Sequence, residues 1–418
     1  MAVINGIKSA IMLIINLGPT VMMPIIMTII GLCLGVKFAR SLKGGLLVGI
    51  GFIGLNATVS ILTGAVQPAV DNMVKLFGLN LTVIDVGWPS ASAIAFGTAV
   101  GVAMIPLGIF INVIMLLTKT TRTVDVDIWD FWHFAFSGSI VYALTHNMLI
   151  ALSLAAVNMV VIMVIADRTA KGTEEILGLP GITFPHGLAG SFVPIAYVLD
   201  KIIDKIPGIN KIKLDENAIN KKLGLIGDPA ILGLIVGLIL GVAGYAFMPN
   251  LTLESKVGSI LTMGVTVSAV LAMSVIMVPI TLLLAIILPG NEFLPLVGLC
   301  GICFQFPLIV AITKGDFFRT FLIGIVVMGL GLYIGTNLAP LFTSAAQAAH
   351  FPIPDGAALI SSIDYGSNPI PWLLVQITNL GPVFIIVVIA LTVLLALWNR
   401  KQILREEQEE AQAANQGE

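Results

Sequence analysis

One histidine stands out among the residues of this chain that could recognise a polar ligand. His186 follows Pro185 and precedes Gly187, within the stretch Leu177–Gly190, which holds two prolines and four glycines. Proline and glycine at this density interrupt a helix and leave backbone groups without their helical partners. In apolar sequence such a backbone is stable where protein or a water-filled cavity surrounds it. We therefore expect His186, with Pro185 and Gly187, to line a polar cavity.

Two further segments combine an acid with the same kind of break. Asp85 precedes Gly87, Trp88 and Pro89, and Asp364 lies in the sequence SSIDYGSNPIPW. A carboxylate at the centre of a bilayer costs about 2.5–3.5 kcal/mol on insertion scales, so it usually faces a cavity. A loop acid at the membrane surface, with Trp88 as an interfacial anchor, explains the first segment equally well. Both interpretations of that segment stay open.

The segment from Asp125 to His133 contains three acids, two tryptophans and a histidine. Carboxylates beside a histidine can bind a metal ion or transfer protons. Tryptophan, however, is enriched at the depth of the lipid headgroups. We therefore predict an amphipathic segment at the membrane interface here, and not a ligand site.

Enzyme and metal motifs give little support to a catalytic function. Cys300 and Cys303 have a C-x-x-C spacing, but no second pair of ligands accompanies them, so we predict two small apolar residues on one helix face. The sequence holds no phosphate-binding loop, no H-E-x-x-H and no G-x-S-x-G. We expect a protein that is not an enzyme and needs no metal or cofactor.

Composition defines the broad class. Hydrophobic residues make up 57% of the 418 residues and charged residues 11%, and the mean hydropathy is +1.04. Several uncharged runs reach about 20 residues, the length that crosses a hydrocarbon core of about 30 Å. A net charge of −2, without a basic patch among aromatics, gives no ground for nucleic-acid binding. The sequence predicts an all-α polytopic membrane protein.

Basic residues between the apolar runs predict the topology. They cluster at 37–43, 119–122, 168–171, 200–222, 314–319 and 400–401. Because basic loops favour the cytoplasm, we predict an external N-terminus and a cytoplasmic C-terminus. Residues 1–398 then form one transmembrane domain with a cytoplasmic loop at about 200–222 that could dock a soluble partner, and 399–418 form a charged tail. In this topology Ile176–Leu199 is either a re-entrant hairpin or one of two paired crossings.

The segments at Asp85 and Asp364 also resemble each other, since both contain Asp-x-Gly followed by proline. Corresponding broken segments in two halves of a chain are typical of the central site of a transporter. Matches this short also arise by chance, so an internal repeat stays one of two interpretations. Taken with the broken segment at His186, these features indicate a permease with a hydrogen-bonding site for a polar solute.

Six segments spread over nearly the whole chain carry a family resemblance. They read NLGPTVMMPI, VIDVGWPSASAIAFG, IPLGIFINVIMLLTKTTRTVDVDIWDFWHFAF, LPGITFPHGLAGSFVPIAYVLDKIIDKIPGINKIK, ILPGNEFLP and GSNPIPWLL. In this order they resemble the galactitol-type enzyme IIC of the bacterial phosphotransferase system. The resemblance implies a fold related to the ascorbate-type IIC permeases. Such a fold has about 9–11 transmembrane helices plus broken-helix or re-entrant hairpins, in an elevator-type transporter with scaffold and core domains.

The same resemblance implies the function and the partners. A galactitol-like polyol or sugar would cross the bacterial inner membrane and be phosphorylated by a partner IIB subunit, which IIA supplies with phosphate. The chain would act as a permease subunit, as a homodimer in membrane lipid. The family's motifs fall on Pro185-His186-Gly187, on Asp85–Pro89 and on Pro289–Asn291. We expect His186 and the acids Asp85 and Asp364 to hydrogen-bond hydroxyl groups, Trp88 to stack on the carbon skeleton, and Asn291 to join the site.

This chain departs from the family pattern at two places. It lacks several tens of residues after Gly244-Tyr245, and Gly298 stands where the family has an acid. Two alternatives therefore accompany the permease. One is an ion-coupled secondary transporter in which acids at the helix breaks and His186 relay protons. The other is a divergent paralogue that does not transport.

Overall fold

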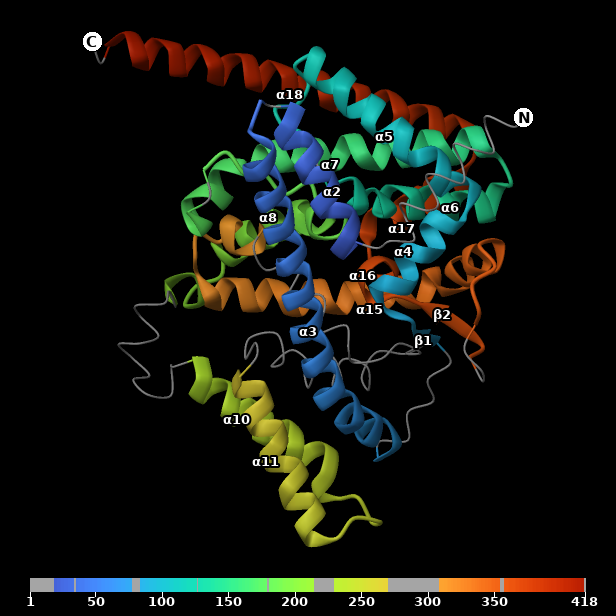
Figure 1. The fold of residues 1–418 in the computed structure, drawn as a ribbon, viewed down its shortest axis with the longest axis vertical. Coiled ribbons are helices and arrows are strands. Elements are labelled where there is room, and N and C mark those ends of the chain that lie inside the picture. The colour runs from blue at the N-terminus through green and yellow to red at the C-terminus, as the bar shows by residue number, and fades with distance from the viewer. Residues whose placement is uncertain are drawn as a thin grey trace.

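Helices make up most of the chain that the computed structural model describes (Figure 1). The described residues are 19–33, 35–76, 83–125, 127–178, 180–213, 229–269, 308–353 and 357–416. The longer helices are α2 (Pro19–Cys33), α3 (Phe38–Leu76), α5 (Ala99–Leu117), α7 (Met148–Leu177), α11 (Leu253–Ala269), α15 (Phe317–Ala348) and α18 (Pro382–Gln416). The shorter ones are α4 (Gly87–Gly97), α6 (Trp132–Thr145), α8 (Ala189–Ile203), α10 (Pro229–Gly241), α16 (Ile363–Gly366) and α17 (Pro369–Leu380), with single turns η1 (Ile128–Phe131), η2 (Ile209–Lys211) and η4 (Val242–Ala246).

Four helices in the described part of the chain are long and apolar enough to cross a membrane. They cover Ala99–Leu117, Met148–Ile176, Phe317–Ala348 and Pro382–Ala413. Large apolar side chains are exposed along the first half of α18, as expected for a helix that faces lipid tails. These helices confirm the prediction of an all-α membrane protein. The predicted total of 9–11 crossings stays a prediction, since other apolar runs lie outside the described residues.

Small residues allow the closest helix contacts. Gly233, Gly237 and Gly241 form a stripe on α10 that faces α11, and a Cβ on Gly237 would lie 2.6 Å from the carbonyl oxygen of Met263. Only glycine lets two backbones approach this closely, a common device in membrane helix pairs. In Figure 1 this pair lies at the bottom of the molecule, and α3 runs between it and the region of α18 at the top.

Two short strands were not predicted from the sequence. β1 (Val83–Asp85) pairs in parallel with β2 (Leu359–Ser361), and the register places Asp85 opposite Ser361. Each strand leads directly into a helix, α4 after β1 and α16 after β2. The two segments with the Asp-x-Gly pattern therefore lie side by side. Three residues per strand are too few to show a periodic pattern, so neither strand is recognisable in the sequence.

The segment with the proline and glycine breaks is a hairpin whose two ends meet. The end of α7 lies against the turn after residue 312, where a Cβ on Gly315 would be 3.6 Å from Ile176. The far end of α8 reaches the same turn, because Asp200 and Asp204 pair with Arg319 just after it. In between, α8 rises only about 22 Å over its 15 residues. The two ends of the segment thus lie at the same turn, and whether it is a re-entrant hairpin or one of two paired crossings stays a prediction.

Candidate functional site

Two short helices begin inside the protein, and each has a histidine at or just before its start. His133 is the second residue of α6, whose first ten residues are all buried. His186 lies three residues before the start of α8 and is half-buried. The two imidazole rings are 4.6 Å apart between centroids. Two histidines from distant parts of the sequence thus meet at one point in the fold.

Asp130 joins the two histidines. Its carboxylate pairs with Nδ1 of His133, and the backbone N–H of Gly187 donates to the same carboxylate. Ligand atoms of Asp130, His133 and His186 all lie within 4.8 Å of one another, close enough to hold a metal ion. Both Nδ1 atoms and the carboxylate are already engaged with each other or with backbone, however. This arrangement is therefore more typical of a hydrogen-bonding site than of a metal centre.

The hydrogen bonds assign the tautomers of the two rings. Nδ1 of His133 donates to Asp130, which leaves Nε2 of a neutral ring as an acceptor. Nδ1 of His186 accepts from the N–H groups of Leu188 at 3.3 Å and Ala189 at 3.1 Å, so the proton of its neutral ring lies on Nε2. One ring presents an acceptor and the other a donor. A hydroxyl group is complementary to such a pair, because it both donates and accepts.

Aromatic rings enclose this pair. The ring of Trp132 stacks on His133 at 4.0 Å, and Tyr365 from α16 lies 5.0 Å from His133 and 5.4 Å from Trp132. The buried hydroxyl of Tyr365 is held at 2.7 Å by both Ser137 and Asn158. Tyr365 is therefore fixed in place and offers its ring as a wall.

Some polar atoms beside Tyr365 are buried without a partner among the described residues. They are Oδ1 of Asn158 and the hydroxyls of Ser361 and Ser362. A buried polar atom without a hydrogen bond costs about 1–3 kcal/mol. Such atoms commonly bind a polar ligand or ordered water. They leave hydrogen-bonding capacity for a polar group beside the ring of Tyr365.

Gly187 shapes the site through its backbone. A Cβ at this position would lie 2.5 Å from Cβ of His133, so only glycine allows the two helices to approach. Its carbonyl accepts from Nδ2 of Asn368 at 3.0 Å, while Oδ1 of Asn368 caps the start of α17. Gly187 therefore belongs to the frame of the site, while Pro185, two residues before it, is half-buried. The sequence reasoning missed Asn368, although an asparagine before a proline at a helix start is a readable cap signal.

Of the other predicted site residues, the structure describes Asp85 and Trp88 in full and the rest only in part or not at all. Asp85 accepts from the backbone N–H of Gly87 at 2.7 Å and so forms the turn that opens α4. Trp88 is half-buried and packs against the core cluster that also contains Trp132 and Tyr365. Asp364 lies on α16, but its side chain lies outside what the structure describes, as do all atoms of Asn291 and Gly298.

One prediction was wrong. The segment from Asp125 to His133 is not an amphipathic strip on the surface, because Phe131, Trp132 and His133 are packed inside the protein and at most 3% exposed. After α5 the chain turns back into the protein, where Asn112 holds it through hydrogen bonds to the backbone of Thr123 and Asp125. The signal that could have identified it is the spacing of Asp130 and His133, which puts an acid and a histidine on one helix face.

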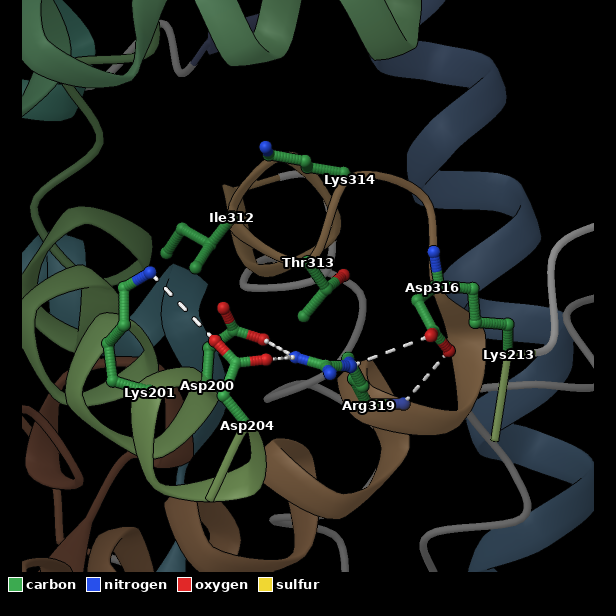
Figure 2. Close-up of a pocket in the computed structure, with 9 residues that line it drawn as sticks. All are labelled: Asp200, Lys201, Asp204, Lys213, Ile312, Thr313, Lys314, Asp316 and Arg319. Carbon is green, nitrogen blue, oxygen red and sulfur yellow. Dashed lines mark hydrogen bonds and ion pairs between the residues drawn. The ribbon is translucent and has the colours of Figure 1, made fainter. Parts of the chain in front are cut away.

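A second polar cluster closes the other end of the hairpin (Figure 2). Arg319 on α15 pairs with Asp200 at 2.9 Å, with Asp204 at 2.7 Å and with Asp316 at 3.7 Å. The hydrogen bond from Arg319 holds the pKa of Asp204 below its usual range. These residues line a cavity of about 330 Å³, together with Lys201, Lys213, Ile312, Thr313 and Lys314. Two basic segments far apart in the sequence thus meet at one end of the molecule.

Comparison with known proteins identifies the family. The model of a family described as the sugar-specific permease component of the phosphotransferase system, EIIC-GAT, matches residues 13–273 and 269–356. The galactitol-specific EIIC component of Escherichia coli K12 is 34% identical over 93% of this chain and 95% of its own length. A putative permease IIC component of the same strain is 33% identical over 94% of this chain and 99% of its own length. This chain therefore belongs to the EIIC-GAT family and is a membrane permease component of a sugar phosphotransferase system.

Proposed function

We propose that this permease carries a neutral polyol of the galactitol type and binds it at the cluster of Asp130, His133 and His186. The observation that carries the proposal is the complementary pair of rings at the start of α6 and α8, one an acceptor and one a donor. A relative of similar length is named as galactitol-specific, which supports a polyol as the substrate class. The partner IIB subunit, phosphorylated by IIA, would then transfer phosphate to the polyol at the inner face.

Each group in the cluster has a role in this proposal. Nε2 of His133 accepts from one hydroxyl of the polyol, and Nε2–H of His186 donates to the same or a neighbouring hydroxyl. The carboxylate of Asp130 holds the ring of His133 in its tautomer. The rings of Trp132 and Tyr365 cover the C–H faces of the carbon chain, as aromatic walls do in ligand sites that also carry a few polar groups.

The remaining predicted residues would extend the same cavity. Trp88 would stack on the carbon skeleton from the α4 side, since it packs against the core that contains Trp132 and Tyr365. Asp85 and Asp364 would accept from hydroxyl groups at the ends of the polyol, and Asn291 would complete the site. The paired strands β1 and β2 support this extension, because they hold the segments of Asp85 and Asp364 together.

We also propose the membrane topology and the mode of transport. The basic residues Lys119, Arg122 and Arg168 contact the charged end of α18, which suits a shared cytoplasmic side. The hairpin, formed by the loop after α7 and by α8 itself, would then enter the membrane from the cytoplasm and return to it. The lysine-rich segment after Asp200 would dock the IIB partner. A core containing the hairpins would move as an elevator against a dimeric scaffold, with the N-terminus outside the cell.

The test is uptake of radiolabelled galactitol into vesicles that contain this chain, with and without a matched IIA and IIB pair and a phosphoryl donor. Accumulation as the phosphate ester only with the complete relay supports the proposal. Uptake that an uncoupler abolishes and the relay does not affect would establish the ion-coupled alternative. Failure with galactitol and a panel of related polyols, from inserted protein with an active relay, would instead favour the paralogue that does not transport.

A further inference from the structure

The last part of α18 is bound to the body of the protein through a polar face. We call residues Asn399–Gln416 the C-terminal arm. Asn399 is completely buried, and its Nδ2 donates to the carbonyl of Thr120 at 2.9 Å and to Oδ2 of Asp167 at 2.7 Å. A buried amide in a helix that has left the apolar region needs such partners. The start of the arm is therefore docked, and does not extend freely from the membrane domain.

Ion pairs continue the same face of the arm. Glu406 pairs with Arg168 at 2.7 Å and with Arg122 at 3.6 Å. Further along, Glu407 pairs with Lys119 at 3.0 Å, and Arg122 reaches Glu410 at 3.6 Å. Asn399, Glu406 and Glu410 are seven and four positions apart, and Glu407 is next to Glu406, so these residues form one side of the helix. By contrast, Arg405 and Glu409 pair only with each other in the contacts of the described residues.

Asp167 connects the arm to the loop that carries His186. Its Oδ1 accepts from the hydroxyl of Thr123 at 2.8 Å, while its Oδ2 accepts from Asn399. Oγ1 of Thr123 also lies 3.1 Å from Oγ1 of Thr183, within hydrogen-bond distance. Thr183 is three residues before His186. A continuous polar path thus runs from the arm to the loop that precedes His186.

We propose that the C-terminal arm is a strap that holds the loop 180–187 in the position where His186 faces His133. The loop itself has proline and glycine breaks and few regular backbone bonds, so side-chain partners must fix it. Asp167 acts as the positioning residue between strap and loop. Release of the arm then increases the mobility of the loop without unfolding the helices around it.

The test is hydrogen–deuterium exchange on the full chain in lipid nanodiscs, with no substrate added. One variant replaces Glu406, Glu407 and Glu410 by Gln, which removes the ion pairs without creating a buried charge. Each exposed ion pair contributes little to stability. We therefore expect the loss of all four contacts together to raise exchange in residues 180–187 by about tenfold. A second variant ends the chain after Trp398. It removes the arm altogether and should have at least the same effect.

Two controls show whether the effect belongs to the strap. Glu409→Gln, on the outer face of the arm, should leave exchange in 180–187 unchanged. Exchange in residues 150–165 of α7 should also stay unchanged, because a general loss of stability would raise it. Glu407→Lys alone should raise exchange in the loop, and adding Lys119→Glu should reverse that rise. Unchanged exchange in 180–187 after removal of the arm overturns the strap, and it does so independently of which solute is transported.

Discussion

The two polar clusters that hold the hairpin differ in their physics. At the start of α8, His186, His133 and Asp130 lie among aromatic rings and are engaged through defined hydrogen bonds. At its end, Arg319 forms ion pairs with three carboxylates beside a cavity lined mostly by charged residues (Figure 2). The buried cluster depends on geometry and tautomer, and the Arg319 cluster on charge. The comparison suggests that the first recognises the solute, while the second fixes the hairpin to α15.

The largest expected effect follows from removal of the ring that donates in the buried cluster. His186→Ala should weaken galactitol binding by about 100-fold. The variant loses the hydrogen bond from Nε2–H to a hydroxyl group of the polyol, and that hydroxyl group is left without a partner inside the protein. The protein should stay folded and inserted. Calorimetric titration of purified protein in nanodiscs measures the affinity.

His146→Asn is the matched control for that substitution. His146 is exposed at the end of α6 in a left-handed conformation that asparagine tolerates, so the affinity should not change. Unaltered affinity in His186→Ala would remove this histidine from the site.

The next effect tests the close approach of the two helices. Gly187→Ala places a Cβ against His133, so α6 and α8 must separate. We expect a loss of about 1–3 kcal/mol in the free energy of unfolding and weaker galactitol binding. Thermal unfolding and titration measure both. Gly178→Asn is the control, since nothing lies within 4 Å of the position of its Cβ and asparagine tolerates its backbone. Native affinity in Gly187→Ala would mean that galactitol binding does not depend on the close approach of α6 and α8.

A smaller effect should follow from changing the residue that orients His133. Asp130→Asn keeps the shape of the side chain. The amide no longer holds His133 in the tautomer that has its proton on Nδ1 and an acceptor at Nε2. Affinity should fall by about tenfold, in line with other residues that orient a ligand-binding histidine. Asp127→Asn, in the same segment, should bind normally. Equal losses in the two variants would mean that charge in this segment, and not the orientation of His133, matters.

The smallest effect on binding is expected at the other cluster. Arg319→Gln leaves carboxylates without their partner, so the free energy of unfolding should fall by about 1–3 kcal/mol. Galactitol affinity should change little, because the cluster does not contact the proposed site. Chemical denaturation and titration measure the two quantities, with the exposed Arg405→Gln as control. A loss of binding as large as that in His186→Ala would contradict the division of roles between the clusters.

The sequence predicted one half of the candidate site and missed the other for identifiable reasons. The density of proline and glycine around His186 reveals a broken backbone without any knowledge of its neighbours. The burial of His133, in contrast, depends on partners far along the chain: Tyr365, which shields it, is bound to Ser137 across 228 positions. The preference of tryptophan for membrane interfaces, on which the sequence prediction relied, contains no information about such long-range contacts. The helical membrane class was readable because composition alone determines it.

The most direct test of the central proposal is an experimental structure of the permease with galactitol bound. We expect one hydroxyl of the polyol within hydrogen-bond distance of Nε2 of both His133 and His186, with the carbon chain between Trp132 and Tyr365. Galactitol bound elsewhere, with the two rings still in contact with each other and with no hydroxyl between them, would contradict the proposal.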